Sequence, residues 1–191
     1  MTTLVNPTHS KLIQKLNTRV VMRVLAATLA LAISAQIAVP LPFTPVPMTL
    51  QTLALFVVAY ALSWRESAST VLLYLGLGTI GAPVFAGFSS GLSLFGPTGG
   101  YLMGFLPAAV FVSLLRPNLK KPSNSPVLST LGRAFLFFVA SFFILGLGAL
   151  QLSFFINSNF VQAIKLGVLP FLLGDVVKVL GAAVATRALK L

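Results

Sequence analysis

Two oppositely charged residues lie three positions apart in an apolar stretch near the end of the chain. Asp175 and Lys178 fall within Pro170–Lys178, which reads Pro-Phe-Leu-Leu-Gly-Asp-Val-Val-Lys. At this spacing both side chains share one face of a helix. A charge at membrane depth costs at least about 2.5–3.5 kcal/mol and faces protein or a wet cavity rather than lipid. The pair predicts a pocket where Asp175 accepts ligand N–H groups and Lys178 meets a ligand oxygen; the alternative is a purely structural link between helices.

A further polar candidate is Gln51, near the start of an earlier apolar run. It either adds an amide contact to the same ligand or extends its side chain to the membrane surface. The sequence leaves both interpretations open.

The other reactive residue types exclude most enzymatic chemistry. The chain has no Cys, a single His (His9), and two acids, Glu66 and Asp175, in different segments. We therefore expect no thiol chemistry, metal site, catalytic triad or paired-carboxylate hydrolase, and no cofactor. No phosphate-binding Gly-x-x-x-x-Gly-Lys-Ser/Thr motif occurs. The net charge of +11 does not indicate nucleic acid, because the basic residues lie between apolar runs.

The composition places the chain in a membrane. Of 191 residues, 57% are hydrophobic and 8% are charged, which is too much apolar surface for a soluble fold of this size. We predict an all-α integral membrane protein in which a basic leader, 1–23, precedes one domain, 24–191, of six transmembrane helices. The third predicted span is short, and five spans are the main alternative. The expected spans are Val24–Val39, Thr49–Ser63, Thr70–Gly81, Gly99–Leu115, Arg133–Leu152 and Val168–Leu189.

The basic residues give the direction of insertion, because Lys and Arg collect on the cytoplasmic side. With six alternating spans, Lys165 lies outside and Lys178 lies within a span, whereas the others share one side. These others are Lys11, Lys15, Arg19, Arg23, Arg65, Arg116, Lys120, Lys121, Arg133, Arg187 and Lys190. We expect both termini in the cytoplasm and the chain in a bacterial inner membrane. Ser34 and Ala35 resemble a signal-peptide cleavage site, but the leader is too long for one.

Three outward segments carry different compositions. Val39–Met48 has four prolines and no charge, so we expect a stiff extended segment that is either a lid or a simple connector. The region 82–101 mixes aromatics with Gly and Ser. Its end at Gly96–Gly100 offers amides to an anionic group, the alternative being an interfacial loop. Ser153–Gly167, with Asn157, Ser158, Asn159 and Lys165, is expected to be an ordinary polar linker.

Small residues recur every four positions in the first predicted span. Ala26, Ala30, Ser34 and Ala38 would allow another helix to approach closely. The partner is either another span of this chain or a separate protein.

Four sequence blocks resemble the BioY family of biotin transporters, in the order of that family. They are Val39–Thr52, Gly81–Gly87, Gly96–Phe105 and Pro170–Lys178. The resemblance implies the substrate-binding S component of an energy-coupling factor (ECF) importer, with six helices and a site under the first and third connecting loops. It implies a transmembrane partner (EcfT), a pair of EcfA-type ATPases, and docking of the partner on the small residues of the first helix.

The same resemblance assigns Asp175 and Lys178 to a biotin site. The ureido ring suits a carboxylate, amide or ammonium, and the apolar parts of biotin suit Phe43, Phe85, Phe88 and Tyr101. Some family members hold the carboxylate with an Arg near the fourth helix. The region 85–105 has no Arg, so Lys178 and the amides around Gly99 and Gly100 are the expected substitutes.

The sequence thus favours a high-affinity biotin uptake component in which ligand binding closes the proline-rich segment. Three alternatives stay open: a stand-alone secondary carrier without ATPase partners, a membrane enzyme, and a purely structural membrane subunit. The absence of catalytic groups argues against the enzyme.

Overall fold

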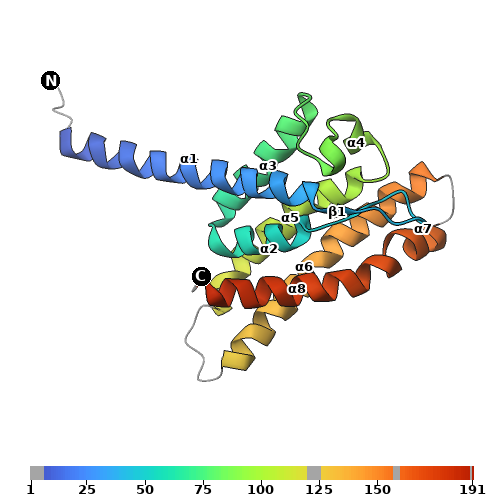
Figure 1. Ribbon diagram of the computed structural model, residues 1–191. Coiled ribbons are helices and arrows are strands. Elements are labelled where there is room, and N and C mark those ends of the chain that lie inside the picture. Colours follow the sequence, from blue (N-terminus) through green and yellow to red (C-terminus); the bar gives the residue numbers. More distant parts are fainter. Residues whose placement is uncertain (1–6, 120–125, 157–159, 190) are drawn as a thin grey trace.

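Helices make up most of the computed structural model, which describes residues 7–119, 126–156, 160–189 and 191. Within these residues two two-residue strands pair in a hairpin, and one 3₁₀ turn precedes the fourth helix (Figure 1). The elements are α1 (Pro7–Gln36), β1 (Ala38–Val39), β2 (Met48–Thr49), α2 (Gln51–Ala61), α3 (Trp64–Thr79), η1 (Ala86–Phe88), α4 (Leu92–Phe95), α5 (Gly99–Leu119), α6 (Pro126–Phe155), α7 (Phe160–Gly167) and α8 (Leu169–Ala188).

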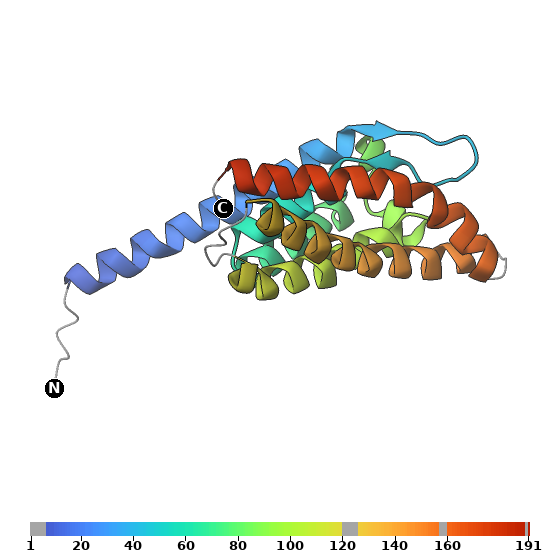
Figure 2. The same ribbon diagram turned by 90° about the horizontal axis from the view of Figure 1, so that it is seen from below.

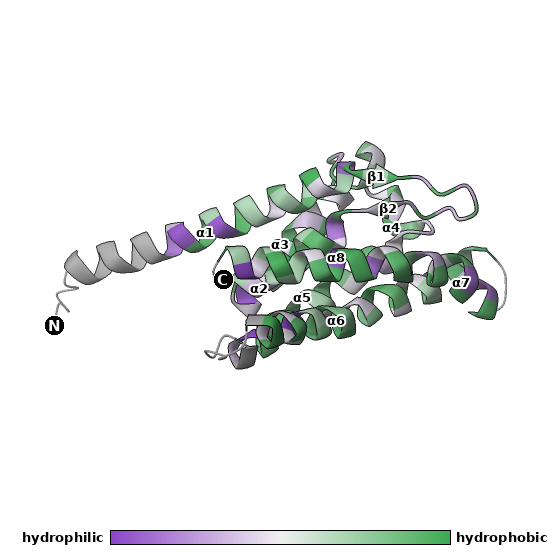
Figure 3. Cartoon of the chain, turned by 60° about the horizontal axis from the view of Figure 1, so that its bottom comes forward, coloured by the Kyte–Doolittle hydropathy of each residue, from purple (hydrophilic) through white to green (hydrophobic). Residues whose placement is uncertain are grey.

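The six predicted spans fall on α1, α2, α3, α5, α6 and α8. Among the described residues, α1, α5, α6 and α8 are long and apolar enough to cross a membrane. Hydrophobic residues cover most of the length of α5, α6 and α8 (Figure 3). α2 has 11 residues and α3 has 16, so at 1.5 Å per residue α2 is only about 16 Å long. The chain is therefore a multi-pass helical membrane protein with four spans evident from length and composition.

Helix α1 is continuous across the expected end of the leader at residue 23. It runs from Pro7 to Gln36, and its N-terminal half projects beyond the other helices (Figures 1 and 2). Residues 1–6 of the leader lie outside the described part of the chain. The division into a leader and a domain stays a prediction.

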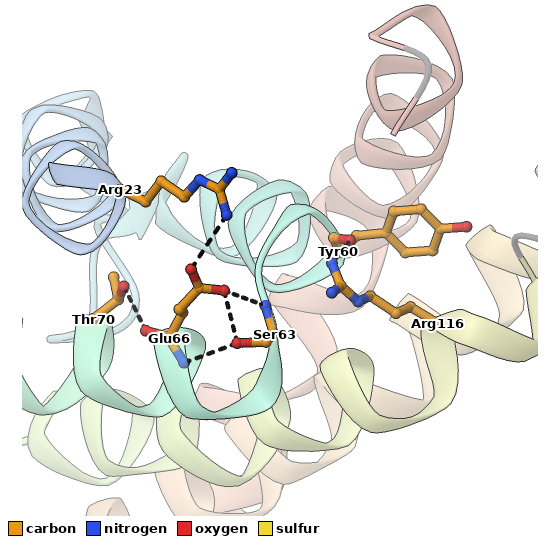
Figure 4. Close-up of polar contacts among 6 residues, drawn as sticks. All are labelled: Arg23, Tyr60, Ser63, Glu66, Thr70 and Arg116. Carbon is orange, nitrogen blue, oxygen red and sulfur yellow. Dashed lines mark hydrogen bonds and ion pairs between the residues drawn. The ribbon is translucent and has the colours of Figure 1, made fainter. Parts of the chain in front are cut away.

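A capping box starts α3 and ties it to α1. The Ser63 hydroxyl accepts from the Glu66 amide, and the Glu66 carboxylate accepts from the Ser63 amide at 2.9 Å (Figure 4). Arg23 of α1 lies 3.5 Å from the other carboxylate oxygen. Burial alone raises the pKa of Glu66, but the hydrogen bonds from Ser63 and the charge of Arg23 outweigh it and hold the pKa below its ordinary value.

Arginines from two further helices meet the end of α2 beside this box. Arg116 of α5 donates to the Tyr60 carbonyl at 2.8 Å, and the Arg133 guanidinium lies 4.9 Å from the centre of the Tyr60 ring (Figure 4 shows Tyr60 and Arg116). Arg133 also contacts the Thr186 hydroxyl near the end of α8 at 3.5 Å. One end of the bundle is therefore basic, in line with the predicted segregation of charge. Lys120, Lys121 and Lys190 lie outside the described residues.

Helix α5 packs closely on α6, and this contact forms part of the core. Gly100 and Gly104 of α5 lie directly against the α6 backbone, where a Cβ at Gly104 would fall 2.6 Å from the Ile144 Cα. Deeper in the bundle, Phe56 of α2 stacks on Phe137 of α6 with ring centroids 5.3 Å apart. Because glycine lets the backbones approach, α5 and α6 pack closely together.

Two outward segments compare differently with expectation. The first, Val39–Met48, contains no helix, as predicted, and connects the two short strands of an antiparallel hairpin that pairs Ala38 with Thr49. The second, Ser153–Gly167, was predicted to be a polar linker, and this is wrong. α6 continues to Phe155, and α7 then forms with Ala163 and Gly167 buried four residues apart. The apolar periodicity of α7 outweighs the polar Asn157, Ser158 and Asn159, which lie outside the described residues.

Candidate ligand-binding site

A cavity of about 400 Å³ lies at the end of the bundle opposite the basic cluster. Volumes of this order hold small organic ligands. Its wall comes from the first turns of α2 and α5, the N-terminal half of α8, the middle of α6, and the connections 46–49 and 85–98. The lining residues are Val46, Pro47, Thr49, Gln51, Thr52, Phe85, Ala86, Ser89, Leu92, Ser93, Gly96, Pro97, Thr98, Tyr101, Leu102, Phe105, Ile144, Leu145, Phe171, Asp175 and Lys178.

The predicted ionic pair is on the wall of this cavity. Asp175 and Lys178 are 2% and 7% exposed, and the Lys178 ammonium lies 3.3 Å from Asp175 Oδ1. Asp175 Oδ2 is buried and has no hydrogen-bond partner in the described part of the chain. An unsatisfied buried carboxylate oxygen is costly. The pair therefore offers one free acceptor, together with the remaining ammonium protons, to a polar ligand.

Two side chains at the start of α2 add polar atoms. Gln51 is 3% exposed, so the interpretation that it reaches the membrane surface is wrong. Its amide nitrogen donates to the Tyr74 hydroxyl at 2.6 Å, and its amide oxygen accepts from Thr49 at 3.3 Å. The neighbouring Thr52 was not predicted, yet its buried hydroxyl lines the cavity without a partner among the described residues. A polar residue directly after Gln51 in an apolar helix was the signal available in the sequence.

Aromatic rings make up the apolar part of the wall. The Tyr101 and Phe171 ring centroids are 6.0 Å apart, and the Tyr101 hydroxyl donates to the Gly167 carbonyl at 2.7 Å, which fixes this ring. Phe85 is almost fully buried. Phe105 and Phe171 were not predicted. They lie four residues after Tyr101 and four before Asp175, a spacing that puts each on the same helix face as its neighbour.

Four other predicted contacts do not line the cavity. Phe43 is 55% exposed in the β1–β2 connection, and Phe88 is 70% exposed. Gly99 and Gly100 have a packing role, because a Cβ on either would collide with the backbone of Leu94 or Leu147. The adjacent residues 96–98 line the cavity in their place. A ligand contact by these four residues stays a prediction.

The small residues predicted as a docking stripe on the first helix differ in their exposure. Ala26 and Ala30 are exposed, whereas Ser34 is buried and donates to the Leu31 carbonyl at 2.9 Å. Ala38 lies in β1. A four-residue step turns about 40° around a helix of 3.6 residues per turn, so such a stripe drifts away from one face. Their role in docking also stays a prediction.

Apolar membrane helices around a cavity that holds a buried ionic pair define a membrane protein that binds a small polar solute. The sequence profile described as the BioY family matches residues 7–191. The chain belongs to the BioY family.

Two named relatives match most of the chain in sequence. The chain is 37% identical over 163 residues to the biotin transporter BioY2 of Lactococcus lactis subsp. cremoris, and the match covers 85% of this chain and 86% of the relative. It is also 37% identical over 153 residues to the biotin transporter BioY of Thermotoga maritima, covering 80% and 85%. Both are named as transporters, and this family membership confirms the expectation that the chain is not an enzyme.

The fold also has a solved counterpart. It is the crystal structure of the S-component for biotin from an ECF-type ABC transporter. That structure superposes with a TM-score of 0.82 at 23% identity, over 92% of this chain and 93% of the other. The two chains share one fold.

Proposed function

We propose that this protein binds biotin from outside the cell as the S component of an ECF-type importer. The observation that carries the proposal is the buried Asp175–Lys178 pair on the cavity wall, with Asp175 Oδ2 unpartnered among the described residues. The names of the family relatives and the shared fold support biotin as the ligand.

Biotin matches the chemistry of the cavity. Its ureido ring carries two N–H donors and one oxygen acceptor, so an N–H group donates to Asp175 Oδ2 and Lys178 donates to a biotin oxygen. The Thr52 hydroxyl is a further polar contact on the same wall. The apolar ring and side chain of biotin lie against Phe85, Tyr101 and Phe171. Leaving a buried N–H unpaired costs roughly 1–3 kcal/mol, so this wall selects for ligands that carry the ureido donors.

The membrane arrangement has six spans, with α2 and α3 crossing together with their flanking segments. The basic end, at Arg23, Arg116 and Arg133, lies in the cytoplasm together with both termini, since Lys and Arg concentrate there. The cavity then opens toward the outside of a bacterial inner membrane. The segment Val39–Met48 acts as part of a lid, because Val46 and Pro47 lie on the cavity wall.

Energy comes from partner subunits, namely an EcfT-type membrane protein that docks on α1 and a pair of EcfA-type ATPases. The exposed, apolar face of α1 at Leu25, Leu29 and Ile33 is consistent with such docking. The second candidate function is a stand-alone biotin carrier, and it differs in needing no ATP.

Calorimetry on the purified protein, stripped of ligand, tests the binding step. We expect one biotin per chain, and no saturable binding at millimolar biotin would contradict the proposal. Uptake into proteoliposomes then separates the two functions. Strict dependence on ATP and on the partner subunits supports the S component, and ATP-independent uptake by the chain alone supports the carrier.

A further inference from the structure

Gln36, the last residue of α1, joins this helix to a turn about fifty positions later in the chain. Its amide nitrogen donates to the Phe85 carbonyl at 3.1 Å, and its amide oxygen accepts from the Phe88 amide at 3.0 Å. The same nitrogen also contacts the Ala32 carbonyl of its own helix at 3.2 Å. A primary amide offers a donor and an acceptor side by side, so one side chain bridges both ends of the turn.

The turn that Gln36 holds has an unusual backbone. Gly87 and Phe88 have φ of 66° and 56°, in the left-handed region. Glycine adopts this region freely, but for Phe88 it is strained, because the Cβ comes close to the following carbonyl oxygen. Phe88 is mostly exposed, so packing of its ring offsets little of this cost. The hydrogen bond from the Phe88 amide to Gln36 therefore favours this conformation, together with the bonds that Ser89 makes to Phe85 and Ala86 within the turn.

The position of this turn determines one wall of the cavity. Phe85 lines the cavity and packs edge-on against Tyr74, with ring centroids 5.3 Å apart. The Phe85 ring occupies the space where Gly78 has no side chain. Ala86 and Ser89 line the cavity as well, whereas Gln36 does not. Gln36 thus contacts Phe85, a residue of the cavity wall, without lining the cavity itself.

We propose that Gln36 is a positioning residue that holds one wall of the cavity in place by latching the turn 85–88 to the end of α1. Because both bonds involve one amide, a displacement of the end of α1 relative to the turn 85–88 breaks them together. The turn then relaxes from its left-handed conformation and moves Phe85 off the ligand. The latch links the position of α1 to ligand release, and this part rests on the proposed biotin function.

Two measurements test the latch, using Gln36→Leu in the full-length protein. Hydrogen exchange of the Phe88 amide reports on its bond to Gln36 without any ligand. We expect the variant to lose the protection of this amide from exchange. The dissociation and association rates of radiolabelled biotin then measure the effect on ligand binding. Two hydrogen bonds of ordinary strength predict dissociation roughly ten-fold faster, with association unchanged or faster, because an open wall admits ligand as easily as it releases it. Ile37→Ala, an exposed neighbour, should leave both readouts as in the wild type.

The outcomes separate the latch from the proposed function. Wild-type Phe88 protection and wild-type dissociation in Gln36→Leu would overturn the latch. If Gln36→Leu folds poorly, Gln36→Glu keeps the acceptor for Phe88 but replaces the donor to Phe85 and Ala32 with an acceptor oxygen. Dissociation at least about three-fold faster is then expected, and an unchanged rate is contrary. If the wild type binds no biotin, the proposed function fails, and Phe88 exchange still decides whether the latch exists.

Discussion

Replacing Asp175 with Asn should weaken both the binding of biotin and the stability of the fold. The substitution keeps the side-chain volume and removes the charge. A hydrogen bond to a charged group contributes about 1.5–3 kcal/mol, so the loss of the bond to biotin weakens binding by roughly 10- to 150-fold. The substitution also leaves Lys178 buried without its partner at 3.3 Å. Breaking a buried pair in this way costs about 3–5 kcal/mol of folding stability.

The double variant Asp175→Asn/Lys178→Met distinguishes these two effects. It removes the uncompensated charge, so thermal unfolding should return toward the wild-type temperature, whereas calorimetry with biotin should show no recovery of affinity. Glu66→Gln is the matched control for affinity and should bind biotin like the wild type, because it makes the same chemical change to the only other acid of the chain, which does not line the cavity. Wild-type affinity in Asp175→Asn, or recovery of affinity in the double variant, would refute the assigned site.

Three further predictions concern packing, pH and the cavity wall. Gly100→Ala places a Cβ against the α6 backbone and should lower stability by about 1–3 kcal/mol, whereas Gly146→Ala, with open space around it, should not; thermal unfolding compares the two, and equal melting temperatures would count against the helix contact. The lowered pKa of Glu66 means that its stabilisation is present above the ordinary carboxyl pKa and is lost as the pH falls through the folded-state value. Melting curves across acidic pH should therefore fall less steeply in Glu66→Gln, and parallel profiles would contradict this. Tyr101→Phe leaves the buried Gly167 carbonyl without its donor and should cost about 1–3 kcal/mol of stability; an unchanged melting temperature would show that the bond is unimportant.

The apolar runs predicted the main helices because lipid requires continuous hydrogen-bonded backbone. The span predicted to start at Gly99 begins where α5 begins, and the span predicted for Val168–Leu189 differs from α8 by one residue at each end. α7 was missed, since its eight residues are too few to span a membrane and its neighbours are polar. The length of α1 was also missed, because the basic residues of the leader suggested a boundary where the helix in fact continues.

The ionic pair was predictable because a lone acid and a lone base in an apolar helix have few interpretations. Both residues indeed lie on the cavity wall. Residue type alone suggests Phe88 and Gly99 as ligand contacts, yet the Phe88 side chain is exposed and a Cβ on Gly99 would collide with the Leu94 backbone. Such outcomes depend on how α4 and its flanking turns fold against α5 and α6, and short uncharged segments carry no periodicity from which to read this.

The most direct test of the central claim is an experimental structure of the protein saturated with biotin. The account predicts biotin in the cavity between α2, α5 and α8, with a ureido N–H within hydrogen-bond distance of Asp175 and a biotin oxygen beside Lys178. Biotin bound elsewhere, or an unoccupied cavity with the ionic pair turned away from it, would contradict the account.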